Sequence, residues 1–166
     1  MSLFTLKGFQ DEVIARKRKL RRFLSGIEKK QPKGLDGATT AIEPEIWKEV
    51  NCLSCANCCK VMTPTYTEKD IRRISKHLSI TAVDFKRRWL KKERGTGDWV
   101  NRSTPCQFLD LQTNYCTIYA VRPADCAGFP HLPKRKMVEY MHVHKQNLEF
   151  CPATYRMIEK LMEKFN

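Results

Sequence analysis

The sequence predicts a small α+β domain with a basic N-terminal helix and irregular loops. Apolar residues recur at helical spacing near both ends and in the middle of the 166-residue chain. Residues 99–100 and 106–119 have instead the composition of short strands, the second stretch around a turn at 112–114. Charged residues make up 30% of the chain and apolar residues 42%, a balance typical of a soluble globular protein.

The N-terminal region is strongly basic. Residues 1–30 hold nine Lys/Arg against three Asp/Glu, and six of the seven residues 16–22 are basic. Apolar residues at near-helical spacing predict that this stretch is an amphipathic helix: Phe9, Val13, Leu20, Leu24 and Ile27. Residues 31–40, which contain one proline and two glycines, predict a linker, and residues 44–50 a short helix. We therefore expect a basic helical arm and linker at 1–45 and a domain at 46–166.

The remaining elements follow from capping and periodicity. Thr67 with Asp70, and Thr81 with Asp84, have the spacing of a helix N-cap and the third helical residue, so each pair predicts a helix start. The second of these helices is expected to end before Gly95. Residues 137–144 alternate as a strand would, and residues 153–165 have the apolar spacing of a closing helix.

Cysteine is the most informative residue type in the chain. Four thiols lie within residues 52–59, and four more follow at wide intervals; the full set is Cys52, Cys55, Cys58, Cys59, Cys106, Cys116, Cys126 and Cys151. Thiolates are soft metal ligands, and the C-x2-C spacing lets two sulfurs from one turn reach the same ion. A disulfide framework is the alternative, but such scaffolds are typically shorter and secreted. The pattern therefore favours a cysteine-ligated metal centre surrounded by the loops.

The segments around the later cysteines resemble a known family. They read PCQFL at 105–109, YCTIY at 115–119, RPADCAGFP at 122–130 and CP at 151–152, in order after the C-x2-C-x2-C-C run. Together these pieces resemble the YkgJ-type CxxCxxCC cysteine-cluster family, described as a zinc- or iron-chelating domain, over roughly residues 50–153. The resemblance implies that all eight cysteines are metal ligands and that the protein binds Zn²⁺ or iron.

Three arrangements of the metal remain open on the sequence. Two mononuclear zinc sites would use four sulfurs each, a compact multinuclear centre would share bridging thiolates, and a [4Fe–4S] cluster would need only four. Cys58 and Cys59 are adjacent, so in extended backbone their side chains diverge toward different partners. This favours two centres, or one centre with a supporting thiol.

The predicted function is metal-ion binding through the eight-cysteine cluster. The alternative is an iron–sulfur redox or catalytic accessory protein that acts with a partner protein. The chain lacks a Gly-rich phosphate loop, a G-x-S-x-G elbow and an H-E-x-x-H helix, which favours a protein without catalytic activity of its own.

Weaker signals concern other side chains and partners. His142 and His144 would share a strand face, and His131 follows the Phe129-Pro130 pair, so these histidines are further ligand candidates. Arg122 is expected to bind a carboxylate or cap a carbonyl near Cys126. The formal net charge of +13 and the basic run allow nucleic acid as a partner. The sequence shows neither a signal peptide nor a transmembrane segment, so we expect a cytoplasmic protein.

Overall fold

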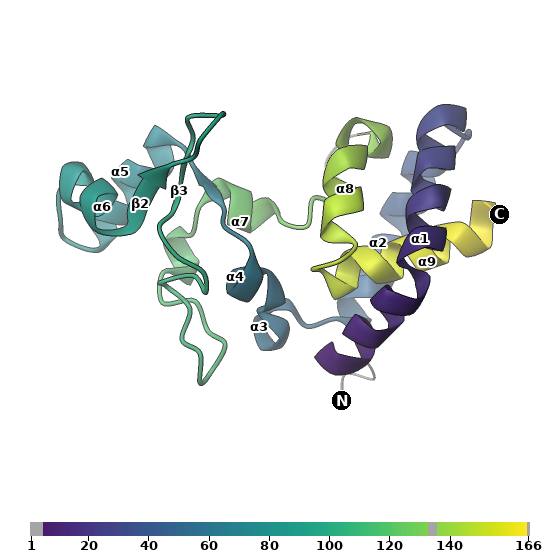
Figure 1. Ribbon diagram of the computed structural model, residues 1–166, viewed down its shortest axis with the longest axis horizontal. Helices are drawn as coiled ribbons and strands as arrows, with labels where there is room; N and C mark the ends of the chain where they lie inside the picture. Colours follow the sequence, from purple (N-terminus) through teal and green to yellow (C-terminus); the bar gives the residue numbers. More distant parts are fainter. Residues whose placement is uncertain (1–4, 133–135, 166) are drawn as a thin grey trace. The chain divides into compact units, whose positions relative to one another are not determined.

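The computed structural model describes residues 5–132 and 136–165, which form two compact units (Figure 1). Unit 1 takes the described residues up to Cys55 and from Pro130 onward, and unit 2 takes Ala56–Phe129. Helices are combined with one three-stranded sheet, which confirms the predicted α+β class. The predicted division at residues 45 and 46 stays a prediction, because compactness alone does not test which part folds independently.

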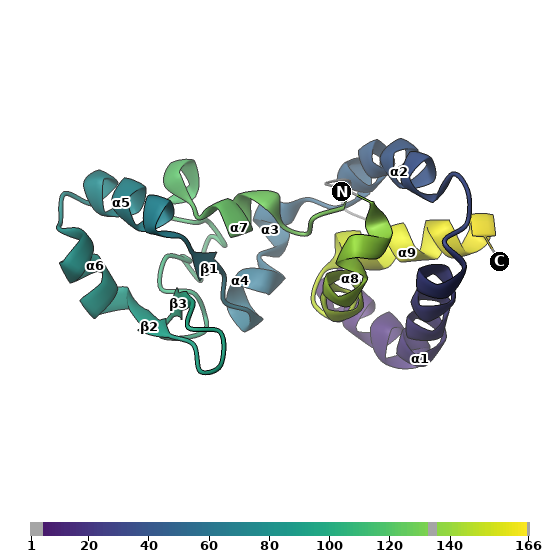
Figure 2. The same cartoon turned by 90° about the horizontal axis from the view of Figure 1, so that it is seen from above.

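Unit 1 is helical throughout its regular structure. Its elements are α1 (Leu6–Lys30), α2 (Leu35–Glu49), α3 (Cys52–Cys55), the 3₁₀ helix η2 (Met137–Tyr140), α8 (Met141–Asn147) and α9 (Pro152–Phe165). α9 packs against α1, α2 and α8, as both ribbon views show (Figures 1 and 2). The apolar face of α9 that these contacts bury includes Tyr155, Ile158 and Leu161.

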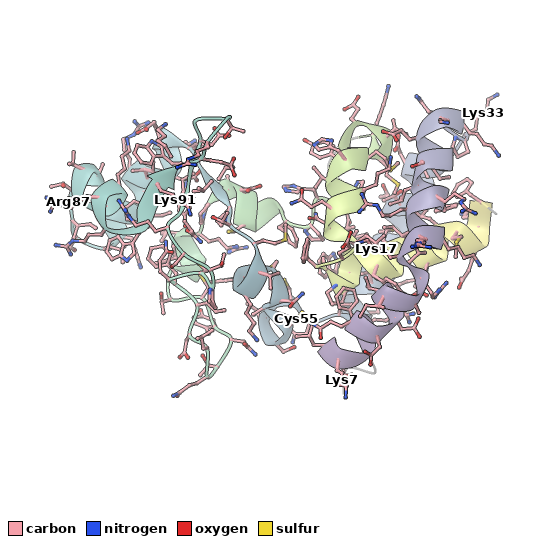
Figure 3. All side chains as sticks on the ribbon, in the orientation of Figure 1. Lys7, Lys17, Lys33, Cys55, Arg87 and Lys91 are labelled. Atoms are coloured by element: carbon pink, nitrogen blue, oxygen red, sulfur yellow. The ribbon has the colours of Figure 1, made fainter. Side chains whose placement is uncertain are left out.

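The long helix α1 confirms the predicted amphipathic basic helix. Its buried residues are the five expected from the spacing: Phe9, Val13, Leu20, Leu24 and Ile27. The Thr5 side chain caps its first turn by accepting a hydrogen bond from the Gly8 amide at 3.1 Å. Figure 3 shows Lys7 and Lys33 near the two ends of α1 and Lys17 between them.

Part of the basic run is used inside unit 1. Arg16 forms an ion pair with Glu159 of α9, and Lys17 and Arg21 both bind Glu149, at 2.6 and 2.7 Å. The remaining cations of the run, Arg18, Lys19 and Arg22, are exposed. The run therefore has a structural half, which ties α1 to the end of the chain, and a solvent-facing half.

Two predictions in unit 1 are wrong. The linker predicted at 31–40 is helical from Leu35 onward. The helix predicted at 44–50 is confirmed, as the second half of the same α2. Residues 137–144 form η2 and the start of α8 instead of a strand. In both places the helix is stabilised by burial of side chains at helical spacing, such as Ala38 and Ile46 in α2 and Met141 and His144 in α8.

Unit 2 contains a small sheet flanked by short helices. Its elements are α4 (Asn57–Val61), β1 (Thr65–Tyr66), α5 (Glu68–His77), α6 (Ala82–Trp89), β2 (Leu90–Lys92), β3 (Trp99–Asn101), the 3₁₀ helix η1 (Tyr119–Val121) and α7 (Ala124–Gly128). The strands are antiparallel in the order β1-β3-β2, with Tyr66 opposite Trp99 and Leu90 opposite Asn101. Figure 2 shows α5 and α6 following one another beside this sheet.

The predicted helix starts in unit 2 are confirmed. The Thr67 hydroxyl accepts from the Asp70 amide at 3.1 Å, and the Thr81 hydroxyl accepts from the Asp84 amide at 3.0 Å. The strand at Trp99 is also confirmed, whereas residues 106–119 contain only one isolated bridge, Leu109 to Cys116.

The core of unit 2 lies between α5, α6 and the sheet. Seven buried residues form it: Tyr66, Ile71, Ile74, Phe85, Leu90, Phe108 and Ile118. Phe85 and Phe108 stack with their ring centroids 6.1 Å apart. Cys106 and Cys116 pack against this cluster, so the core fixes the backbone on which two of the cysteines lie.

Candidate metal centre

The C-x2-C-x2-C-C run is divided between the two units. Cys52 and Cys55 lie at the two ends of α3 in unit 1, whereas Cys58 and Cys59 lie on α4 in unit 2. Between these helices Ala56 adopts a left-handed backbone conformation, with φ at 46°. The Sγ atoms of Cys58 and Cys59 are 3.9 Å apart, so the two side chains do not diverge as they would in extended backbone.

Three later cysteines lie in unit 2 on separate segments. The Cys106 amide donates to the Cys59 carbonyl at 2.8 Å, which joins the loop after β3 to α4. Cys116 pairs with Leu109 across a short turn, and Cys126 lies on α7. The fold therefore gathers sulfur-bearing segments that are separated by up to 67 residues in the sequence (59 to 126).

The four thiols of Cys59, Cys106, Cys116 and Cys126 are close enough for their charges to act on one another. We call them the unit 2 thiol group. Burial raises the pKa of Cys106, Cys116 and Cys126, and charge on other members of the group raises each pKa further. The hydrogen bond with the Cys58 thiol outweighs burial at Cys59 and lowers its pKa to about 7. A divalent cation would relieve this mutual repulsion.

Unit 1 contains three cysteines, Cys52, Cys55 and Cys151, and two of them, Cys52 and Cys151, act on one another electrostatically. Cys151 is buried just before α9, where burial raises its pKa to about 11, and Cys52 is exposed but near enough for its charge to raise the Cys151 pKa as well. Cys52 also borders a hollow of about 370 Å³ next to Trp47 and Leu53. Cys55 is half-buried at the end of α3 (Figure 3).

All eight cysteines are free thiols, which excludes a disulfide set in this structure. In the described parts of the chain, no three His, Cys, Asp or Glu side chains already stand in a geometry that would hold a metal ion. The donor chemistry nevertheless fits zinc or iron, because both metals are held by sets of four thiolates. The unit 2 thiol group places four thiols within one compact unit.

A hydrogen-bond network positions the α7 cysteine. Buried Asp70 binds Arg73 at 2.7 Å and accepts from the Ala124 amide at 3.1 Å, and Arg73 donates to the Arg122 carbonyl at 2.7 Å. Asp125 accepts from the Thr65 amide at 3.0 Å. These contacts anchor both sides of the turn that leads to Cys126.

Arg122 caps a carbonyl, which is one of the two roles predicted for it. Its Nη1 atom donates to the Tyr119 carbonyl at 2.8 Å, and its guanidinium lies 3.9 Å from the centre of the Tyr119 ring. The side chain thereby braces the segment between Cys116 and Cys126.

The predicted pairing of histidines on a strand face is wrong, because residues 141–147 are helical. His142 is exposed and His144 is buried, as expected for positions two apart on a helix. The His131 ring stacks on Tyr140 with a centroid separation of 6.0 Å. Whether any of the three binds metal stays a prediction.

Sequence reasoning missed two polar residues beside the unit 2 thiol group. Tyr66 has a pKa raised by burial and then by the charges of Cys106, Cys126 and Cys116, so it lies near three members of the group. Its hydroxyl donates to the buried Asn101 at 2.6 Å. The only sequence signal was a polar residue closing an otherwise apolar strand, which is too common to indicate a site.

Comparison with known proteins decides the family. The CxxCxxCC family model, described as "Putative zinc- or iron-chelating domain", matches residues 51–152. The chain belongs to this family. The match confirms the resemblance predicted from the cysteine ladder, and it supports metal-ion binding with zinc or iron as the metal.

Part of the chain is also similar in sequence to a curated archaeal protein. The chain is 34% identical over 82 residues to the "Uncharacterized protein MJ0661" of Methanocaldococcus jannaschii. The alignment covers 49% of this chain and 44% of that relative, so the chain spans less than half the length of the relative it matches. No solved structure matches the chain.

Among residues 5–132 and 136–165, every helix is either too short or too polar to cross a bilayer.

Proposed function

We propose that the protein chelates zinc or iron through its cysteine thiolates, and that Cys59, Cys106, Cys116 and Cys126 form one four-sulfur centre inside unit 2. The observation that carries the proposal is that the fold joins the segments on which these thiols lie: the Cys106 amide donates to the Cys59 carbonyl at 2.8 Å, and Leu109 pairs with Cys116. Besides burial, charge on Cys59 also raises the pKa of Cys106, Cys116 and Cys126. Four thiolates are the ligand set of structural zinc sites and of iron–sulfur clusters.

The surroundings of the unit 2 thiol group favour an anionic metal centre. Four thiolates on one divalent ion carry a net charge of −2, which nearby positive charge stabilises. Residues 56–129 hold thirteen Lys/Arg against seven Asp/Glu. The excess of positive charge in unit 2 would stabilise the negatively charged metal–thiolate centre, and it would equally attract an external anionic partner.

The other cysteines remain proposed ligands on the family resemblance. Cys58 adjoins the group through its contact with Cys59. Cys52, Cys55 and Cys151 belong to unit 1, where the structure supports only the proximity of Cys52 and Cys151. All eight cysteines are therefore proposed as metal ligands, with the strongest support for those in unit 2.

Native mass spectrometry of the full chain, purified without oxygen, tests the shared centre. Cys106→Ala and Cys116→Ala should each lose the same metal ion or cluster, and the double variant should lose no more than either single variant. Ser54→Ala, in the same run but without a thiol, is the matched control and should keep the full metal content. Losses that add in the double variant would show that the two thiols belong to different centres.

The metal itself separates the two candidate functions. A colourless protein with stoichiometric zinc supports a structural, storage or sensing role. A brown protein with acid-labile sulfide supports the iron–sulfur alternative, in which the protein acts as a redox or catalytic accessory of a partner.

A further inference from the structure

Asn101 is buried next to a proposed metal ligand with half of its hydrogen-bonding capacity used. The side chain is 1% exposed and closes strand β3. Its carbonyl oxygen Oδ1 accepts from the Tyr66 hydroxyl at 2.6 Å and from Gln107 Nε2 at 2.9 Å. Its amide nitrogen Nδ2 is fully buried and has no hydrogen-bond partner among the described residues. A buried amide without an acceptor is costly, so it indicates a missing partner.

The orientation of the Asn101 amide is determined by its neighbours. The Trp89 carbonyl can only accept, so Gln107 must turn Nε2 toward it, and this atom lies 3.3 Å away. The same Nε2 donates to Asn101, which must therefore present Oδ1. Exchanging O and N in Asn101 would place two amide nitrogens against each other.

The Cys106 thiol is the nearest candidate partner by position: Gln107, which follows Cys106 directly, binds Asn101 Oδ1 at 2.9 Å, and Cys106 packs against the core cluster that contains Tyr66. Asn101 interacts with the Cys106 thiol in the direction that lowers its pKa, against the larger raising effect of burial. Sulfur becomes a good acceptor when it is a thiolate, as it is when bound to metal. The Asn101 donor is thus preorganised for the metal-bound form of Cys106.

We propose that Asn101 is a positioning residue of the metal centre, whose Nδ2 donates an N–H···S hydrogen bond to the Cys106 thiolate and whose orientation is held by Tyr66 and Gln107. The inference rests on the proposed function. Hydrogen bonds to ligating sulfur withdraw charge from it and hold its direction, which tunes both metal affinity and reduction potential.

Co²⁺ titration of the reduced full chain tests the proposal, because thiolate-to-cobalt charge transfer reports directly on the sulfurs. Asn101→Leu keeps the volume and removes the donor. We expect its charge-transfer band to move to lower energy and Co²⁺ affinity to fall about tenfold or more. Asn147→Leu is the matched control, since Asn147 is also 1% exposed but lies in unit 1; its charge-transfer band should be unchanged.

A milder variant keeps the test decisive if Asn101→Leu fails to fold. Tyr66→Phe removes only the hydroxyl that holds Oδ1, and it should shift the band in the same direction by less. If Asn101→Leu folds and its thiolate band is identical to that of the wild type, the role of Asn101 is overturned. If Asn101→Leu does not fold, an identical band in Tyr66→Phe overturns it. Absence of any thiolate band in the wild type would instead overturn the proposed function.

Discussion

At the scale of single residues, Asp70 is a buried carboxylate in unit 2. Burial by itself would raise the pKa of Asp70, but hydrogen bonds from Thr67 and Arg73 outweigh it and lower the pKa below its ordinary value. The carboxylate therefore joins α5 to the turn before Cys126 as a charged group with all its partners in place.

Removing this carboxylate should destabilise unit 2. We expect Asp70→Ala to lower the free energy of unfolding by about 2–4 kcal/mol, since it leaves the Ala124 amide without its acceptor and removes the anion that pairs with Arg73. Asp84→Ala is a close control. On the neighbouring helix α6, Asp84 is bound by its own capping residue Thr81 and pairs with Arg87 three residues later, in the same arrangement. Its loss should be much smaller, and equal losses in urea denaturation would contradict this account of Asp70.

His144 should make unit 1 sensitive to acid. Burial, and then the charges of His131 and His142, lower its pKa to about 4. The unfolded chain takes up the proton near pH 6.5, whereas the folded chain does so only near pH 4, so stability is complete above pH 6.5 and is lost as the pH falls. Between pH 7.5 and pH 5 the loss should be about 2 kcal/mol.

Denaturation at the two pH values checks this expectation. His144→Asn should flatten the pH dependence, and His142→Asn, which changes an exposed residue on the same helix, should leave it as it is. A wild-type protein equally stable at pH 7.5 and pH 5 would refute the assignment.

At the scale of secondary-structure elements, strong local signals predicted the structure and weak ones failed. The apolar spacing of α1 and the Thr–Asp caps of α5 and α6 are short-range features, and they were read correctly. The first half of α2 was missed because Pro32, Gly34 and Gly37 favoured a linker there. Residues 137–144 were misread because a short apolar alternation fits a strand and a half-buried helix equally well.

The helix α1 provides its own test of the packing in unit 1. Leu20→Ala removes a fully buried side chain and should cost about 2–5 kcal/mol of unfolding free energy. Ile14→Ala, on the same helix but with the side chain 80% exposed, should stay within about 0.5 kcal/mol of wild type. Thermal unfolding that ranks the two variants the other way would show that α1 does not pack as described.

Nucleic acid as a partner stays a prediction, and the ion pairs of α1 indicate which variants test it cleanly. Arg18, Lys19 and Arg22 are exposed, so replacing them with alanine changes the outer charge with little effect on packing. Replacing Arg16 or Lys17 would also break pairs with Glu159 or Glu149. The salt dependence of nucleic-acid affinity should therefore be compared between the wild type and the alanine variants of Arg18, Lys19 and Arg22 only.

At the scale of the whole molecule, the candidate site was only partly readable from the sequence. The cysteine ladder identified the family, which is described as a zinc- or iron-chelating domain. It did not show that Cys59, Cys106, Cys116 and Cys126 share one unit, because long-range folding brings them together. Asn101 gave only the common signal of a polar residue at the end of a strand, since its relevance depends on Trp89 and Gln107 holding its amide in one orientation.

Removal of the metal should loosen unit 2 selectively. Metal binding to the folded state adds its binding free energy to stability, so chelation under reducing conditions should lower the unfolding midpoint. Hydrogen exchange should show the Cys106 and Thr117 amides losing protection, because they bond to segments next to the thiol group. The amides of the buried middle of α1 should keep theirs, and a uniform loss across both units would argue against a centre confined to unit 2.

X-ray absorption at the metal edge of oxygen-protected, full-length protein tests the central claim most directly. A centre of four cysteine thiolates predicts a first shell made only of sulfur, near ~2.3 Å for zinc, with a lower sulfur number in Cys106→Ala. A first shell of oxygen or nitrogen, or a folded wild-type chain that carries no stoichiometric metal, would contradict it.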